Sequence, residues 1–140
     1  MKDLLTVQNG KLIIALSRAL QTIHKKSELL FRQKGLTMAQ FAVLEALLHK
    51  GDLTIGALID AVLSSSGNMT VVVRNLEQHS WVQRIENPAD RRSFLISLTD
   101  TGRTLIEEVF TEHMLLVEDS LSPLTTAERE TVTTILRKLG

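Results

Sequence analysis

Apolar residues recur every three or four positions along most of this chain, and they alternate with polar residues along one short stretch only. The first recurrence runs from about Asn9 to Lys34 and predicts a helix of about seven turns. Its apolar positions are Leu12, Leu16, Ala19, Leu20, Ile23, Leu30 and Phe31. Gly35 predicts the end of this helix, because glycine favours the left-handed backbone found just past helix C-termini.

Two shorter helical patterns come next. Thr37 is expected to start the first of them with Gln40 as its reciprocal capping partner, and Gly51 is expected to end it. Thr54 is expected to cap a third helix. The apolar positions of that helix are Ile55, Leu58, Ile59 and Val62.

A fourth helix is expected over about 67–79, capped by one of the serines at 64–66. Its centre holds three consecutive β-branched residues, Val71–Val73, which by propensity favour a strand. A helix is preferred because Val72, Val73 and Leu76 have the spacing of a core-facing helix, whereas the polar residues between them do not alternate as a strand requires.

The alternating stretch predicts a β-hairpin. Its first strand is expected over 81–86, and its second contains Phe94, Ile96 and Leu98 on one face. Residues 87–90, Asn-Pro-Ala-Asp, supply the turn chemistry between the strands. Trp81 is interpreted as a core residue between helix and sheet.

Two further helices complete the chain. Thr99 or Asp100 is expected to cap a long fifth helix, and Thr125 with Glu128 predicts a capping box at the start of a sixth, after Pro123. Helix, turn, helix and a hairpin with cations at its tip are the layout of a winged helix-turn-helix. The expected fold is therefore mainly α with a small β-hairpin (α+β).

Composition limits the classes of function. The 140 residues are expected to form a single domain, 1–140. Absence of cysteine excludes thiol redox sensing, disulfides and thiolate metal sites. The apolar run from Leu12 to Leu16 is too short to cross a membrane and lacks a cleavage pattern, so a cytoplasmic protein without a membrane partner is expected.

The formal net charge is zero, but the charges are segregated. Residues 1–34 are rich in Lys and Arg, whereas 104–130 are rich in Asp and Glu. These segments either attract each other, within or between chains, or are simply solvated helix faces. The charge balance alone does not indicate a nucleic-acid partner.

The fourth helix offers side chains suited to DNA. Hydroxyl and amide groups donate to phosphates or base edges, asparagine pairs with adenine, arginine reaches guanine or phosphate, and valine contacts the thymine methyl group. The candidates are Ser65, Ser66, Asn68, Thr70, Val71 and Arg74. The alternative is that they form the polar side of an ordinary surface helix.

The hairpin tip carries the stronger signal. Asp90 is expected to accept hydrogen bonds from backbone amides or a guanidinium, so that Arg91 or Arg92 projects outward. An arginine held in this way is attracted to the narrow, strongly negative minor groove of A·T-rich DNA.

At this point the residues carry a family resemblance. Ser-Ser-Gly-Asn-Met-Thr at 65–70, Asp-Arg-Arg at 90–92 and Leu-Thr-Asp-Thr-Gly at 98–102 follow in the order typical of the MarR (multiple antibiotic resistance regulator) family of bacterial repressors. The chain resembles this family across 36–103. The long helices on either side also lie where the family has its dimerisation helices.

The resemblance implies a set of roles. Arg92 would contact the minor groove and Asp90 would position it, while the exposed side of the fourth helix would face the major groove. Residues 1–34 and 104–140 would form dimerisation helices flanking the DNA-binding region, and the homodimer would bind a palindromic operator. Val71–Val73 depart from the pattern, because many relatives have a cation there. This departure bears on the operator sequence more than on DNA binding itself.

A homodimer is also expected on physical grounds. One helix-turn-helix reads about half a helical turn of DNA, and two copies roughly 34 Å apart combine their affinities. The segments 9–34 and 100–119 hold more apolar surface than one small winged domain requires. The alternative is that they form a bundle within one chain.

A small-molecule effector is a further implication of the resemblance, since many relatives release DNA when a ligand enters the cleft beside the winged domain. Its candidate contacts lie near the junction of the first two helices: His24, Phe31, Met38 and Phe41.

Other chemistry has little support in the sequence. The four histidines form no short metal motif, so no metal or cofactor is expected, although a zinc site of His113 with nearby glutamates is one alternative. No nucleophile and base are paired, so an enzyme is not expected. The chain is therefore interpreted as a DNA-binding regulator, with a winged-helix module that binds protein instead of DNA as the alternative.

Overall fold

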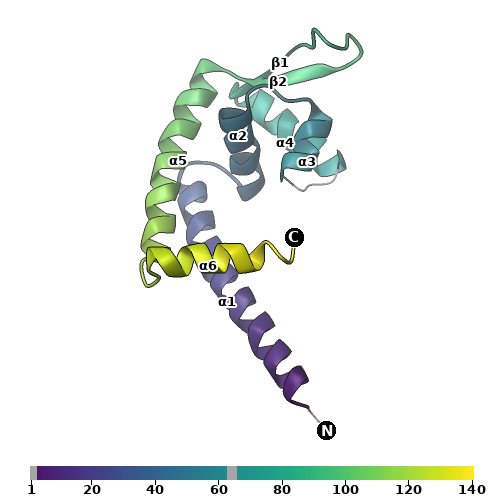
Figure 1. Ribbon diagram of the computed structural model, residues 1–140. Helices are drawn as coiled ribbons and strands as arrows, with labels where there is room; N and C mark the ends of the chain where they lie inside the picture. Colours follow the sequence, from purple (N-terminus) through teal and green to yellow (C-terminus); the bar gives the residue numbers. More distant parts are fainter. Residues whose placement is uncertain (1–2, 63–65) are drawn as a thin grey trace.

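The computed structural model describes residues 3–62 and 66–140, with Ser66 described in its backbone only. Figure 1 shows a helical body from which a hairpin and the N-terminal half of the first helix project. The described residues form α1 (Leu4–Gln33), α2 (Met38–Lys50), α3 (Ile55–Val62), α4 (Ser66–Gln78), β1 (Val82–Glu86), β2 (Phe94–Leu98), α5 (Asp100–Leu121) and α6 (Thr126–Leu136). The expected class, mainly α with a small hairpin, is confirmed.

Short polar contacts start most helices where the sequence predicted. At α2, Gln40 N donates to Thr37 Oγ1 at 3.1 Å and Thr37 N donates to Gln40 Oε1 at 2.9 Å. The same box begins α6, between Thr125 and Glu128. These caps satisfy backbone amides that have no partner within the helix. The serine cap expected before α4 involves residues 64–66 and lies outside the described residues.

The start of α1 was predicted too late. The helix begins at Leu4 instead of near Asn9, because the carboxylate of Asp3 accepts a hydrogen bond from Thr6 N at 2.6 Å. This bond caps the helix one turn before the apolar stripe starts, and it lowers the pKa of Asp3. Gly10 lies within the helix.

The helical interpretation of Val71–Val73 is confirmed. Val73 is fully buried and Val72 nearly so, whereas Val71 is half exposed on the opposite side of α4. Burial of one helical face outweighs the small preference of β-branched residues for strands.

The hairpin is extended by a third short segment. β1 and β2 pair antiparallel with Val82 opposite Leu98. Leu53, in the connection between α2 and α3, forms a bridge with Ile96, donating its N–H to Ile96 O at 3.1 Å and accepting from Ile96 N at 2.7 Å. These bonds join β2 to the helices beneath it.

One core joins α2, α3, α4 and the hairpin to the end of α1 and the beginning of α5. Its buried side chains are Phe31, Leu36, Phe41, Val43, Leu44, Leu47, Leu58, Met69, Val72, Val73, Leu76, Val82, Ile96, Leu98, Ile106 and Val109. Trp81 only partly fits its expected role: it packs against this core from the edge, and its ring stacks on His79 with centroids 4.3 Å apart.

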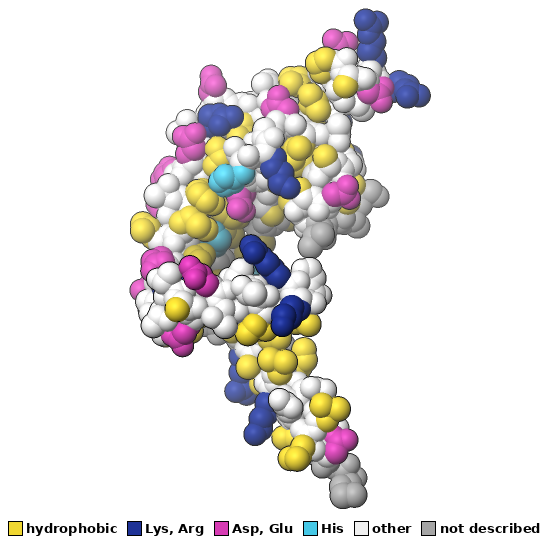
Figure 2. Space-filling model, in the orientation of Figure 1, with side chains coloured by type: hydrophobic (Ala, Val, Ile, Leu, Met, Phe, Trp, Pro, Cys, Tyr) yellow, Lys and Arg dark blue, Asp and Glu magenta, His cyan; other side chains and the backbone are white. Residues whose placement is uncertain are grey.

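Large parts of α1 and α6 lie outside this core. Hydrophobic side chains line the projecting half of α1, and Figure 2 shows them next to basic side chains of the same segment. α6 has no buried residue. Among the described residues, no single helix is long and apolar enough to cross a membrane, and only α3 taken together with Gly67–Gln78, at a bend of 109°, reaches that length and composition.

Candidate nucleic-acid interface

α4 has two chemically distinct faces. Met69, Val72, Val73 and Leu76 are buried against the core. The exposed side carries most of the residues expected to contact DNA, namely Asn68, Thr70, Val71 and Arg74. Ser65 and the side chain of Ser66, which belong to the same prediction, lie outside the described residues. Arg74 forms no ion pair or side-chain hydrogen bond with any other residue of the described chain, so its guanidinium is available to an external anion.

The tip of the hairpin is a hydrogen-bonded loop that presents arginine. Asp90 Oδ1 accepts from the backbone N–H of Arg92 at 3.0 Å and from its Nε at 3.4 Å. The side chain of Arg92 is nevertheless 92% exposed. The carboxylate thus restrains the backbone and the Nε of Arg92, and it leaves the two terminal nitrogens of the guanidinium exposed to solvent.

Asn87 stabilises the same loop from its other end. Its Oδ1 accepts from Ala89 N at 3.0 Å, and its Nδ2 donates to Ser93 Oγ at 3.0 Å. Ser93 also donates from its backbone N–H to Asp90 O at 3.2 Å. Such asparagine and aspartate turns fix a loop without apolar anchors.

An ion pair connects the hairpin to α4. Arg84 Nε on β1 lies 3.0 Å from Glu77 Oε1 on α4, and both side chains are partly exposed. The contact is therefore worth little to stability. It is a side-chain contact between the hairpin and the helix that carries the candidate DNA contacts.

The start of α5 packs against Ser80 and Trp81, the two residues that precede β1. Thr99 Oγ1 donates to Ser80 O at 2.6 Å and accepts from Gly102 N at 3.0 Å, while Thr99 N donates to Trp81 O at 3.1 Å. A Cβ on Gly102 would overlap the Trp81 carbonyl. This contact explains the Leu-Thr-x-x-Gly motif physically: threonine caps α5 and glycine admits the neighbouring backbone.

Comparison with known proteins decides the family. The model of the MarR family matches residues 36–94. MhqR of Bacillus subtilis, an HTH-type transcriptional regulator, is 35% identical over 136 residues, which cover 97% of this chain and 94% of MhqR. The chain belongs to the MarR family. The resemblance expected from the order of the motifs is confirmed.

Two solved structures add a spatial comparison. The crystal structure of a mutant MarR from E. coli complexed with operator DNA is 26% identical, with a TM-score of 0.76 and coverage of 99% of both chains. BpsR of Bordetella bronchiseptica, whose DNA binding is regulated by 6-hydroxynicotinic acid, is 28% identical with a TM-score of 0.72, over 89% of this chain and 98% of BpsR. The winged-helix architecture expected from the sequence is confirmed.

In this MarR-family chain, two of the four candidate effector contacts lie together. The rings of Phe31 and Phe41 are stacked with centroids 4.1 Å apart, and both side chains are buried in the core. Met38 lines a separate surface pocket with Glu28 and Arg32. The four residues therefore do not line one cavity in this structure.

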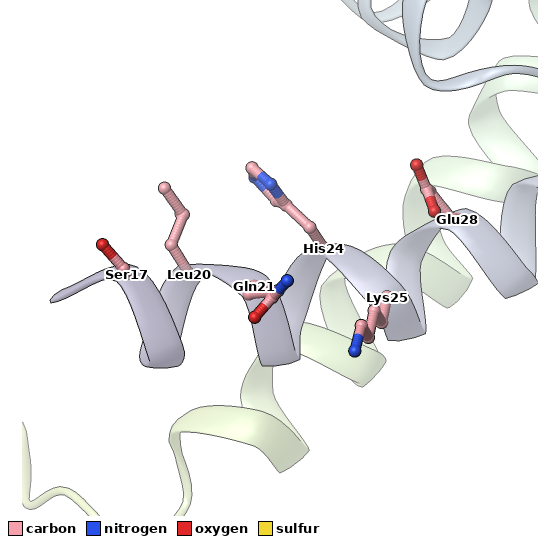
Figure 3. A pocket seen from close by; sticks show the side chains of 6 residues that line it. All are labelled: Ser17, Leu20, Gln21, His24, Lys25 and Glu28. Atoms are coloured by element: carbon pink, nitrogen blue, oxygen red, sulfur yellow. The ribbon is translucent and has the colours of Figure 1, made fainter. Parts of the chain in front are cut away.

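His24 lies apart from the stacked rings. It projects from α1 over an open surface hollow lined by residues of that helix alone, as Figure 3 shows. The neighbouring side chains are Ser17, Leu20, Gln21, Lys25 and Glu28.

His113 was missed as a partner of the stacked rings. Its ring centroid lies 5.0 Å from those of both Phe31 and Phe41, and its Nε2 is 3.0 Å from Ser27 Oγ. Its buried Nδ1 has no hydrogen-bond partner among residues 3–62 and 66–140, and burial lowers the pKa of its imidazole. Only the tertiary structure brings α1, α2 and α5 together around it.

The charge segregation produces one direct contact. Lys34 Nζ, at the end of α1, lies 3.0 Å from Glu112 Oε1 and 3.3 Å from Glu108 Oε1 on α5. These two carboxylates raise the pKa of Lys34. Attraction between the basic and acidic segments therefore occurs within one chain at this point. Among the described residues, no three histidine, aspartate or glutamate side chains are placed to share a metal ion.

Proposed function

We propose that this chain is a dimeric, sequence-specific DNA-binding regulator that acts as a repressor. In each copy α4 enters the major groove and Arg92 reaches into the adjacent minor groove. The observation that carries the proposal is the hairpin tip, where Asp90 restrains an arginine that stays almost fully exposed. A structural arginine would be expected to bury its guanidinium against carboxylates or carbonyls instead.

The contacts with DNA divide between the two elements. Asn68, Thr70, Val71 and Arg74 would read or position the major groove from α4, together with Ser65 and Ser66. Arg91 and Arg92 would approach the minor groove from the hairpin, with Asp90 as the positioning residue. The Arg84–Glu77 ion pair supports this division, because it joins the hairpin to α4 and the two elements would then approach the DNA together.

Dimerisation would use 1–34 and 104–140, with 36–103 as the DNA-binding region. The support is the apolar surface that one chain leaves uncovered. On α1, on α6 and just after α6 it includes Leu4, Leu5, Leu12, Ile13, Ile14, Ile135, Leu136 and Leu139. A palindromic operator follows from the symmetry of such a homodimer.

A small molecule would release the DNA by binding between the dimerisation helices and the DNA-binding region. The regulation of the related BpsR by 6-hydroxynicotinic acid supports this part of the proposal. Phe31, Phe41, Met38 and His24 remain the candidate contacts, and a cavity among them would have to open when the ligand binds. The proposal includes no catalytic activity and a cytoplasmic location, where bacterial operators lie.

A gel-shift titration with the DNA upstream of the chain's own coding sequence tests the proposal. Wild type should bind one duplex selectively and more weakly as salt rises. Arg92→Ala should lose about 1–3 kcal/mol of binding free energy and about one unit of salt slope. Arg103→Ala, which removes an exposed cation of α5 outside the proposed DNA contacts and the proposed dimerisation segments, is the matched control and should bind like wild type.

Two results would reject the proposal. Absence of binding to any duplex at low salt would favour a protein-binding winged helix. Equal losses in Arg92→Ala and Arg103→Ala would mean that the hairpin has no special role in binding.

A further inference from the structure

The hairpin has an inner face that looks toward α4. Cross-strand partners in an antiparallel pair project to the same side. Arg84 pairs with Ile96, and because Arg84 contacts Glu77 of α4 while Ile96 is fully buried, this side faces the helices. Residues two positions along a strand share a face, so Phe94 lies on the inner face as well.

Phe94 differs from the other apolar residues of that face. Ile96 and Leu98 are buried in the core, whereas the side chain of Phe94 is 52% exposed and belongs to no part of it. Half of a phenylalanine therefore faces solvent at a site where the fold does not need an aromatic ring.

The surroundings of Phe94 indicate what covers it. It lies two residues after Arg92 of the turn, and Figure 2 shows hydrophobic, basic and acidic side chains together on the projecting hairpin. Arg91 and Arg92 are exposed at the tip. Residues 82–98 carry three arginines against Glu86 and Asp90, and two of the arginines are at the exposed tip, so a polyanion would be attracted there.

We propose that the ring of Phe94 packs on the deoxyribose of the DNA strand that separates the two grooves. The inference rests on the proposed function: with α4 in the major groove and Arg92 in the minor groove, that strand must pass the inner face between them. Glu86, opposite Phe94 in the hairpin, keeps a phosphate away from this point and leaves the apolar edge of the sugar as the surface in contact.

An apolar contact with sugar has its own signature. It adds affinity on every sequence without releasing counterions, so Phe94→Ala should weaken binding about tenfold on operator and non-operator DNA alike. The slope of affinity against salt should remain that of wild type, in contrast with Arg92→Ala. Phe94→Leu, which keeps apolar surface without a ring, should recover part of the loss.

Hydroxyl-radical footprinting identifies the contact on the DNA. Wild type should protect sugars beside the minor groove that Arg92 enters, and Phe94→Ala should lose protection at those sugars while the remainder of the footprint persists. The melting temperature of Phe94→Leu should equal that of wild type, because the ring lies outside the core.

Three outcomes would overturn the inference while DNA binding by wild type stands. They are an unchanged affinity and footprint for Phe94→Ala, a changed salt slope, and a shift in dimer dissociation without DNA that would place the ring against a second copy. Failure of wild type to bind any duplex would reject the proposed function itself.

Discussion

At the tip of the hairpin, the carboxylate of Asp90 restricts the conformation of Arg92. Asp90 contacts both the backbone and the Nε of Arg92. Because Asp90 and Arg92 are two residues apart, this geometry forms locally and requires no support from the core. At an exposed ion pair the gain in stability is small, so its use is to reduce the conformational freedom that the arginine loses on binding.

A double-mutant cycle tests this positioning role. Asp90→Ala should weaken DNA binding by less than Arg92→Ala, and in an Arg92→Ala background it should cost almost nothing further. Binding free energies of the four proteins, measured at one salt concentration, give the coupling. Additive losses would mean that Asp90 does not act through Arg92.

His113 predicts a pH dependence of stability. Burial lowers the pKa of the folded-state imidazole below its usual 6.5, an effect that Glu45 partly opposes. Between pH 6.5 and the lower folded-state pKa, the unfolded chain therefore binds more protons than the folded one, and stability falls as pH decreases through that window. Well above pH 6.5, the contribution of His113 to stability does not change with pH.

Denaturant unfolding at pH 7.5 and at pH 5.5 measures this effect. Wild type should be less stable at pH 5.5, and His113→Phe, which cannot bind the proton, should lose less stability between the two values. An equal loss in both proteins would assign the dependence to other groups.

At the scale of elements, the joint between β1 and α5 couples the hairpin to the long helix. Thr99 caps α5 while bonding to Ser80, and Gly102 lets the helix approach the Trp81 carbonyl. Ser80 has a positive φ of 59°, an uncommon conformation for a residue other than glycine. Hydrogen bonds and a close backbone approach thus hold the start of α5 against the base of the hairpin.

Gly102→Ala should disturb this joint. The added methyl group would overlap the backbone of Trp81, which cannot move aside as a side chain could. The expected loss of unfolding free energy is about 1–3 kcal/mol or more. Gly56→Ala in α3 is the control, because its Cβ would meet only Thr54 Oγ1 at an ordinary 3.9 Å. That variant should be unchanged or up to about 1 kcal/mol more stable. Thermal or denaturant unfolding compares the two, and similar values would show that the approach at Gly102 is not tight.

At the scale of the whole molecule, no other part of the described chain covers the apolar surface of α1 and α6. α6 leaves α5 at a corner held by Arg129, which donates to the carbonyl oxygens of Leu124 and Leu121 and pairs with Glu118. This corner sets the direction of α6 although none of its residues is buried. The exposed side chains of α6 are thus presented in a defined orientation.

Ile135→Asp tests whether this surface is the dimer interface. Placing a carboxylate where a partner should cover an apolar side chain is expected to weaken the dimer by at least about 2 kcal/mol. Thr134→Asp on the adjacent position, which faces another side of the helix, is the matched control. Sedimentation over a range of concentrations measures the dissociation constants, and equal values for both variants would contradict the proposed interface.

The sequence by itself determined the elements and their order, because those depend on contacts over three or four residues. Thr37 with Gln40 and Thr125 with Glu128 mark helix starts, and the spacing of Val72, Val73 and Leu76 identifies the buried side of α4. The Asp90–Arg92 contact was predictable for the same reason. The start of α1 was predicted late because its cap at Asp3 precedes the apolar pattern.

Only the tertiary structure decided which distant side chains meet. His113 and Ser27 are 86 positions apart, and Lys34 and Glu112 are 78 apart, so no local pattern announces either contact. Trp81 was expected in the core and lies at its edge, because the hairpin passes over the end of α4 and places the ring on His79. Such pairings depend on how α1, α2 and α5 pack, and packing is settled by the shapes of all the buried side chains together.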